Sequence, residues 1–141
     1  NKMEEIKTGT GRKLKDGEDV AVLTLGPIGN DAIQAIEEVE KETEMSVAHY
    51  DMRFVKPLDE NILTEVGKKF KHIVTIEDGV RNGGMGSAVL EWMSDHGYQP
   101  TITRMGLPDD FVEHGTVSQL REIVHLDNNS IKETLKAVSR S

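Results

Sequence analysis

The chain has 141 residues, of which 36% are hydrophobic and 30% charged, with a net charge of −8 at pH 7 and no cysteine. This composition fits one soluble globular domain, and no stretch approaches the roughly 20 apolar residues that cross a bilayer. The acidic balance argues against a nucleic-acid partner, and the lack of cysteine excludes disulfides and thiolate metal sites and fits a cytoplasmic protein.

The strands are predicted from their apolar patterns. A short polar strand within residues 9–17 ends in a turn at Asp16-Gly17. The runs Val20–Gly26 and His72–Asp78 are apolar without alternation, as in strands that are covered on both faces. Further strands are predicted at Ser46–Phe54 and Pro100–Met105.

Helices are predicted between these strands. The first places Ala32, Ile33, Ile36 and Val39 on one side, and Asp59 is positioned to cap the next. Two capping boxes near the end of the chain predict two more helices, Thr116 with Gln119 before Leu120, Ile123 and Val124, and Ser130 with Glu133 before Leu135 and Val138. Strands that alternate with helices indicate a mostly parallel sheet between helical layers.

The segment TIEDGVRNGGMGSAVLEW, residues 75–92, predicts a strand, a glycine turn and a helix. This order can hold a phosphate at the helix N-terminus. However, Val89 stands where a dinucleotide fingerprint needs its third glycine, and Ser87-Ala88 replace the Walker lysine and hydroxyl. We therefore favour a packing role for the glycines, and expect a strand-end carboxylate, Glu77 or Asp78, to bond to amides of this turn.

No other motif amounts to an active site. The run DDFVEHG places carboxylates beside His114, but it lacks the usual histidine or cysteine spacing of a zinc site, so we interpret His114 as a hydrogen-bonded loop residue. A nucleophile elbow, Gly-x-Ser-x-Gly, is also missing from the sequence.

Three segments carry a resemblance to a known family: DMRFVKPLDENIL at 51–63, VTIEDGVRNGGMGSAVLEWM at 74–93 and GLPDDFVEHGTVSQL at 106–120. In this order they resemble the C-terminal domain of the transketolase superfamily, and the first segment is most similar to the 1-deoxy-D-xylulose-5-phosphate synthase family. The glycine segment is also similar to β subunits of 2-oxo-acid dehydrogenases. The resemblance runs from about Gly9 to the last helix, which leaves residues 1–8 as a leader or linker remnant and 9–141 as the domain.

The resemblance implies a three-layer α/β/α sandwich with a five-stranded mixed sheet whose first strand is antiparallel. It also implies a transferase that uses thiamine diphosphate and Mg²⁺ to join pyruvate and glyceraldehyde 3-phosphate with loss of CO₂, for isoprenoid, thiamine and pyridoxal synthesis. The expected partners are the N-terminal and middle domains of the same enzyme and a second copy in a homodimer.

The resemblance assigns no catalytic, cofactor-binding or metal-binding residue to this chain, because the family's Gly-Asp-Gly motif is missing from the sequence. The isolated chain is therefore expected to be inactive and to bind neither cofactor. Two alternatives stay open: a 2-oxo-acid dehydrogenase β-subunit domain, and a regulatory phosphate or nucleotide module that uses the Gly83–Gly86 turn. Matching positions with structural or interface roles are Arg53, Lys56, Pro57 and Asp59 at a strand–helix junction, Glu77 with Gly83, Gly84 and Gly86, and His114 with Gly115.

Overall fold

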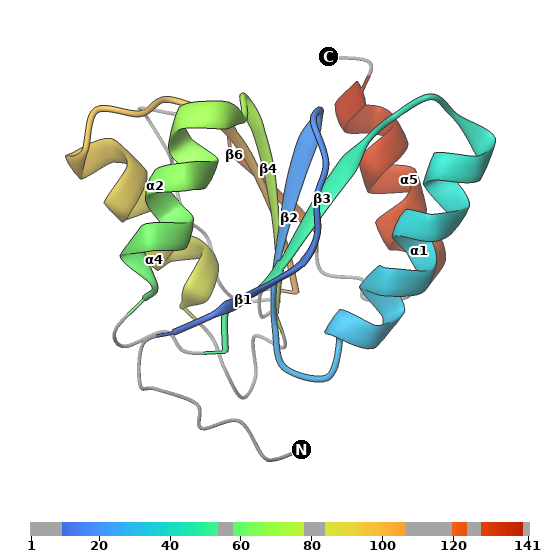
Figure 1. Cartoon of the computed structure of the whole chain (residues 1–141), viewed down its shortest axis with the longest axis horizontal. Helices are drawn as coiled ribbons and strands as arrows, with labels where there is room; N and C mark the ends of the chain where they lie inside the picture. The colour runs from blue at the N-terminus through green and yellow to red at the C-terminus, as the bar shows by residue number, and fades with distance from the viewer. Residues whose placement is uncertain (1–9, 54–57, 78–83, 107–119, 124–127, 140–141) are drawn as a thin grey trace.

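The computed structural model describes residues 10–53, 58–77, 84–106, 120–123 and 128–139. From β2 to β5, strands and helices alternate along the chain, and β6 is the next described element after β5 (Figure 1). The elements are β1 (Arg12–Lys15), β2 (Val20–Leu25), α1 (Gly29–Glu42), β3 (Val47–Asp51), α2 (Glu60–Lys69), β4 (His72–Glu77), α4 (Met85–Asp95), β5 (Thr101–Met105), β6 (Leu120–Ile123) and α5 (Asn128–Ser139).

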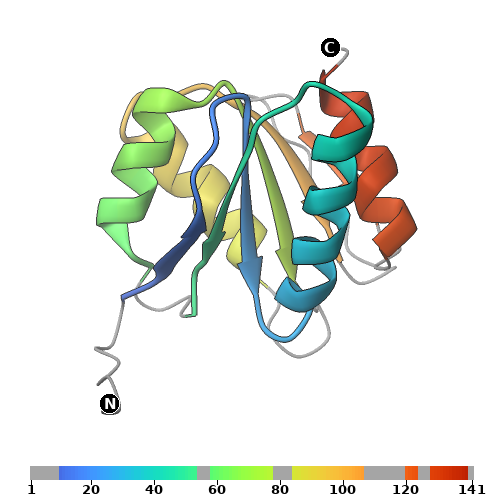
Figure 2. The ribbon, with the colours of Figure 1, turned by 45° about the vertical axis from the view of Figure 1, so that its right-hand side comes forward.

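The strands form one six-stranded sheet in the order β1-β3-β2-β4-β5-β6. β1 pairs with β3 in antiparallel orientation, and the other neighbouring strands are parallel. α1 and α5 cover one face of the sheet and α2 and α4 cover the other (Figures 1 and 2). This parallel topology places the carboxyl ends of β2, β3 and β4 and the beginnings of α1, α2 and α4 at the same edge of the sheet, called here the carboxyl edge.

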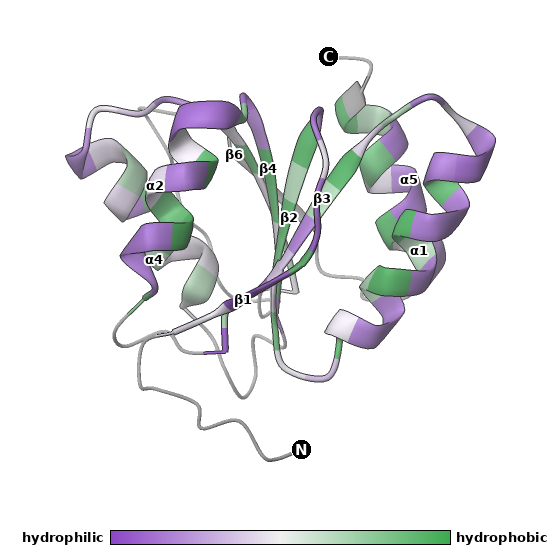
Figure 3. Cartoon of the chain, viewed as in Figure 1, coloured by the Kyte–Doolittle hydropathy of each residue, from purple (hydrophilic) through white to green (hydrophobic). Residues whose placement is uncertain are grey.

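Each face of the sheet has its own apolar core. Alternate residues of β2 point to opposite faces, so that Leu23 packs towards α2 and α4 while Val22 packs towards α1 and α5. Figure 3 shows the apolar stretches along the central strands. The central strand β2 is buried along its whole length, which explains its continuous apolar sequence.

The predicted fold class is confirmed: a three-layer sandwich with a mixed sheet whose first strand is antiparallel. The sheet has one strand more than predicted. Residues 120–123 form β6 rather than the predicted helix, because they pair in parallel with β5 in the register Ile102↔Leu120 to Met105↔Ile123. The last helix begins at Asn128, so the capping box predicted at Ser130 is wrong.

The predicted cap at Asp59 is confirmed. Asp59 Oδ1 accepts hydrogen bonds from the N–H groups of Asn61 at 2.9 Å and Ile62 at 3.2 Å. The apolar stripe of α1 is narrower than predicted, since Ala32, Ile36 and Val39 are buried whereas Ile33 is 41% exposed.

Candidate functional site

The carboxylate of Glu77 occupies the beginning of α4. Glu77 is the last residue of β4 and is only 1% exposed. Its two oxygens accept hydrogen bonds from the backbone N–H groups of Met85 at 2.9 Å and Gly86 at 2.7 Å. These donors belong to the group of N–H groups that a helix leaves without a partner at its N-terminus, and a negative charge there is favoured. This is the expected contact between a strand-end acid and the glycine segment.

Two positions of this segment require glycine, each for a different physical reason. Gly84, at the N-cap of α4, has φ of 109°, and a Cβ added there would meet no atom within 4 Å. Gly84 is therefore required for its left-handed backbone and not for space. At Gly86, an added Cβ would lie 2.7 Å from Nε of Arg104 and 3.0 Å from Oγ1 of Thr75. Gly86 therefore lets α4 approach β4 and β5 closely.

A buried arginine lies beneath the first turn of α4. Arg104 of β5 is 1% exposed, and its Nη2 donates a hydrogen bond to Oγ of Ser87 at 2.7 Å. Neighbouring Thr75 in β4 is in register with Arg104. Glu77, Ser87 and Arg104 thus join α4 to two strands, and we call the set formed by Thr75, Glu77, Gly86, Ser87 and Arg104 the α4 anchor.

At the strand–helix junction after β3, carboxylate side chains also hold the backbone in place. Arg53 has φ of 63°, which is uncommon for a residue with a side chain, and its N–H donates to Oδ1 of Asp51 at 3.1 Å. Asp59, besides capping α2, accepts a hydrogen bond from the N–H of Gly11 at 2.8 Å through Oδ2. A single carboxylate therefore joins α2 to the segment before the edge strand β1.

The structure brings only part of the predicted residues together. Glu77 and Gly86 meet in the α4 anchor, with Gly84 beside them at the N-cap of α4, and Arg53 and Asp59 lie at the separate junction after β3. Residues 1–8 and the predicted positions Lys56, Pro57, Gly83, His114 and Gly115 lie outside the described residues. Sequence reasoning missed Arg104, although an arginine inside the otherwise apolar or hydroxyl-bearing strand TITRM is a signal for a buried charged contact.

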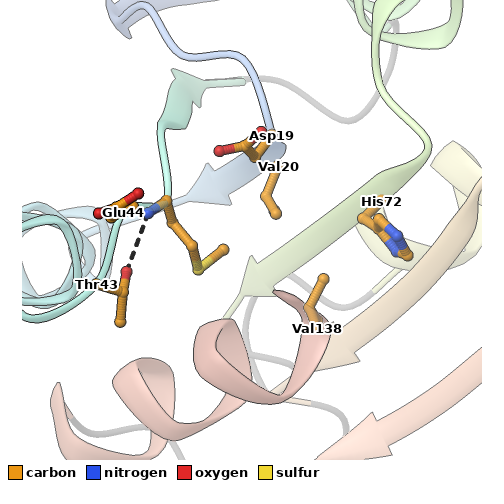
Figure 4. Close-up of a pocket in the computed structure, with 7 residues that line it drawn as sticks. Asp19, Val20, Thr43, Glu44, His72 and Val138 are labelled. Atoms are coloured by element: carbon orange, nitrogen blue, oxygen red, sulfur yellow. Dashed lines mark hydrogen bonds between the residues drawn. The ribbon is translucent and has the colours of Figure 1, made fainter. Parts of the chain in front are cut away.

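A cavity opens at the opposite edge of the sheet, where β2 and β4 begin (Figure 4). Its volume is about 420 Å³, and Asp19, Thr43, Glu44 and His72 contribute polar groups to its lining. Part of this lining serves the fold, since Oδ2 of Asp19 accepts from the N–H of Ser46 and Oγ1 of Thr43 accepts from the N–H of Met45. Among the described residues, no group of three or more His, Cys, Asp and Glu could hold a metal ion. In the same residues, no helix is long and apolar enough to cross a membrane.

A family model, "Transketolase, C-terminal domain", matches residues 9–131. The chain belongs to this family. The family explains the described architecture, in which an antiparallel edge strand precedes a parallel α/β/α sandwich. As a transketolase C-terminal domain, the chain shares its fold with a solved structure named "Split gene transketolase, inactive beta4 tetramer", with a TM-score of 0.76 and 26% identity. That match covers 95% of this chain and 43% of the other.

The curated relatives of this transketolase C-terminal domain include 1-deoxy-D-xylulose-5-phosphate synthases. The protein from Bacteroides thetaiotaomicron is 60% identical over 135 residues, which are 95% of this chain and 21% of the relative. The protein from Geobacillus sp. is 42% identical over 137 residues, which are 96% of this chain and 22% of the relative. The chain thus spans about one fifth of the length of these relatives.

These matches confirm the resemblance to the synthase family and give no support to the β-subunit alternative. The regulatory phosphate module finds no support either. Two N–H groups at the start of α4 that would hold a phosphate already bind the buried carboxylate of Glu77.

Proposed function

We propose that this transketolase domain is the C-terminal domain of a 1-deoxy-D-xylulose-5-phosphate synthase. The whole enzyme would join pyruvate and glyceraldehyde 3-phosphate with loss of CO₂, using thiamine diphosphate and Mg²⁺. The observation that carries this proposal is 60% identity to such a synthase over 95% of the chain. Because the chain spans 21% of that relative, the reaction is assigned to a larger enzyme and not to these residues alone.

The start of α4 and the buried Arg104 do not fit the diphosphate group of the cofactor. A diphosphate needs free N–H donors, as at a helix N-terminus, or cationic side chains that it can reach. At α4, the N–H groups of Met85 and Gly86 already bind Glu77, whose own charge would repel an anion. Arg104 is buried and engaged with Ser87. We therefore assign the cofactor to other domains of the enzyme.

The role that we propose for the chain is structural: it folds as a unit, docks against the N-terminal and middle domains, and takes part in a cytoplasmic homodimer. The internal use of Glu77 and Asp59 supports this role, because both carboxylates at the carboxyl edge fix helices of the chain itself. In this arrangement the α4 anchor and the junction after β3 keep the domain surface rigid for docking.

Isothermal titration calorimetry of the chain with thiamine diphosphate and Mg²⁺ tests the cofactor assignment. We expect no heat of binding at millimolar ligand, and a micromolar affinity would overturn the assignment. The enzyme assignment is tested with the whole gene product, assayed for deoxyxylulose phosphate formed from pyruvate and glyceraldehyde 3-phosphate. Product formation that is lost on deleting residues 9–141 supports the proposal, and a whole enzyme that forms no such product refutes it.

A further inference from the structure

Two exposed apolar side chains meet at one groove on the α1 face of the sheet. Among the described residues, Leu14 and Ile33 are the exposed large hydrophobic side chains, at 36% and 41%. Both line a groove of about 270 Å³, together with Lys15, Ile36, Glu37 and His49. We call this feature the β1–α1 groove, because Leu14 comes from β1 and Ile33 from α1.

The sheet topology leaves this groove uncovered by the described elements. β1 is the edge strand, and α1 packs against β2, β3 and α5 further towards the middle of the sheet. The two helices of this layer, α1 and α5, therefore leave the part of the face that belongs to β1 without a helix (Figure 2). Leu14 is the apolar residue of the otherwise basic strand RKLK, and nothing in this strand's own pairing with β3 requires a leucine there.

The groove has one hydrogen-bonding group that is buried and fixed, the imidazole of His49. His49 is 1% exposed, and its Nε2 lies 2.9 Å from Oγ1 of Thr24. The hydroxyl of Thr24 donates to the carbonyl oxygen of Tyr50 at 3.5 Å, so it accepts the proton of Nε2. Burial lowers the pKa of His49 to about 4, which keeps the ring neutral at pH 7. This assignment of the tautomer leaves Nδ1 as an acceptor.

The chemistry of the groove therefore combines apolar walls with one buried acceptor and with the charged side chains of Lys15 and Glu37. Leu14, Ile33 and Ile36 supply the walls, and His49 supplies the acceptor. The volume of about 270 Å³ equals that of about nine waters at ~30 Å³ each, which is room for one large side chain. Aromatic side chains that carry a donor, tyrosine and tryptophan, match this combination and are typical anchors of protein interfaces.

We propose that the β1–α1 groove is the docking seat for a tyrosine or tryptophan side chain carried by another domain of the same synthase polypeptide. The inference rests on the proposed function, since the curated relatives are about five times as long as this chain, which covers 21% of one of them. A domain that shares its polypeptide with that much more chain has a neighbour able to cover this groove. Burial of Leu14 and Ile33 by the neighbour removes the exposed apolar side chains from water.

The test compares hydrogen exchange in the whole enzyme and in the isolated chain. In the whole enzyme, we expect amide exchange at residues 12–15 and 29–37 to be at least about tenfold slower than in the isolated chain. Ile33→Glu in the whole enzyme should return this exchange to the rate of the isolated chain. The same change should lower the unfolding midpoint of the isolated chain only slightly, because Ile33 is 41% exposed there. Asn30→Glu, at an exposed position of the same helix outside the groove, is the matched control.

Each of the following outcomes would refute the proposed docking site. Equal exchange in the whole enzyme and the isolated chain would mean that nothing covers the groove, and equal effects of Ile33→Glu and Asn30→Glu would mean that the groove makes no contact of its own. A dimer of the isolated chain that Ile33→Glu abolishes, with the whole enzyme unaffected, would assign the groove to a second copy. Failure of the proposed function is distinct, because the unmodified whole enzyme would then form no deoxyxylulose phosphate.

Discussion

From the hydrogen bonds of Glu77 we predict that Glu77→Gln lowers the stability of the chain. The substitution keeps the shape of the side chain but removes the charge and replaces one acceptor oxygen by an NH₂ group. Both oxygens now accept backbone N–H groups, at 2.9 Å from Met85 and 2.7 Å from Gly86. In the variant, one of these N–H groups would face another donor at a site that is 1% exposed, where water cannot replace the lost acceptor.

The expected loss follows from these two changes. A hydrogen bond to a charged group contributes about 1.5–3 kcal/mol, and a carboxylate at a partly buried helix N-terminus contributes up to ~2 kcal/mol. Removing a buried charge also relieves its desolvation, which offsets part of this loss. We therefore expect the free energy of unfolding to fall by about 2–3 kcal/mol. With a urea m-value of about 1–3 kcal/mol/M, the midpoint should shift by about 0.7–3 M.

Urea unfolding followed by circular dichroism measures this shift. The matched control is Glu91→Gln, which makes the same chemical change at an exposed position of the same helix and should change the free energy by less than about 0.5 kcal/mol. A Glu77→Gln variant as stable as its control would show that the charge at the start of α4 contributes nothing net. The α4 anchor would then be a contact without energetic consequence.

Three further predictions use the same measurement. Gly86→Ala should lower the free energy of unfolding by about 1–3 kcal/mol, because the new Cβ would lie 2.7 Å from Nε of Arg104. Gly84→Ala should lower the free energy of unfolding by about 1–2 kcal/mol, and here the only cause is the backbone φ of 109°. Only the former should perturb the NMR side-chain signals of Arg104. Asp59→Ala should cost about 2–3 kcal/mol and speed amide exchange at residues 12–15, since the same carboxylate also holds the segment before β1; unchanged exchange there would refute the second part. For His49, the folded pKa of about 4 lies below the usual 6.5, so the unfolded state takes up the proton first as the pH falls. The stability due to neutral His49 is complete above pH 6.5 and is lost as the pH falls towards 4, so the wild type should lose about 2 kcal/mol more than His49→Phe between pH 7 and pH 5.

The sequence predicts the sheet well where a strand's position decides its composition. β2 and β4 are apolar runs because both faces are covered, and this requirement is visible without any structure. The cap at Asp59 is predicted for a similar reason, since an N-terminal cap depends on residues a few positions away. Such local rules hold because the interaction and the sequence signal lie in the same short segment.

The errors occur where distant contacts decide the structure. Residues 120–123 show apolar residues at a helical spacing, but their pairing with β5 makes them a strand, and four residues are too few for a pattern to distinguish the two. The burial of Arg104 beneath Gly86 depends on how α4 crosses β5, which the sequence of neither element records. Ile33 shows the opposite case, an apolar residue on a predicted buried stripe that the described chain leaves exposed. Departures of this kind from local expectation are typical of functional surfaces, which is why Ile33 becomes the central residue of the docking proposal.

Three of the helices that begin at the carboxyl edge, α1, α2 and α4, show how the chain uses the positions where α/β sheets usually bind ligands. At α1, the first N–H groups, those of Gly29 and Asn30, donate to carbonyl oxygens of the preceding turn. At α2 the donors bind Asp59, and at α4 they bind Glu77. Each helix thus satisfies N–H groups at its N-terminus with acceptors from the same chain, and two of these acceptors carry the negative charge that a phosphate would otherwise supply. This arrangement is that of a domain that stabilises itself at the edge where α/β sheets usually bind ligands, and it agrees with our proposal that other domains of the enzyme hold the cofactor.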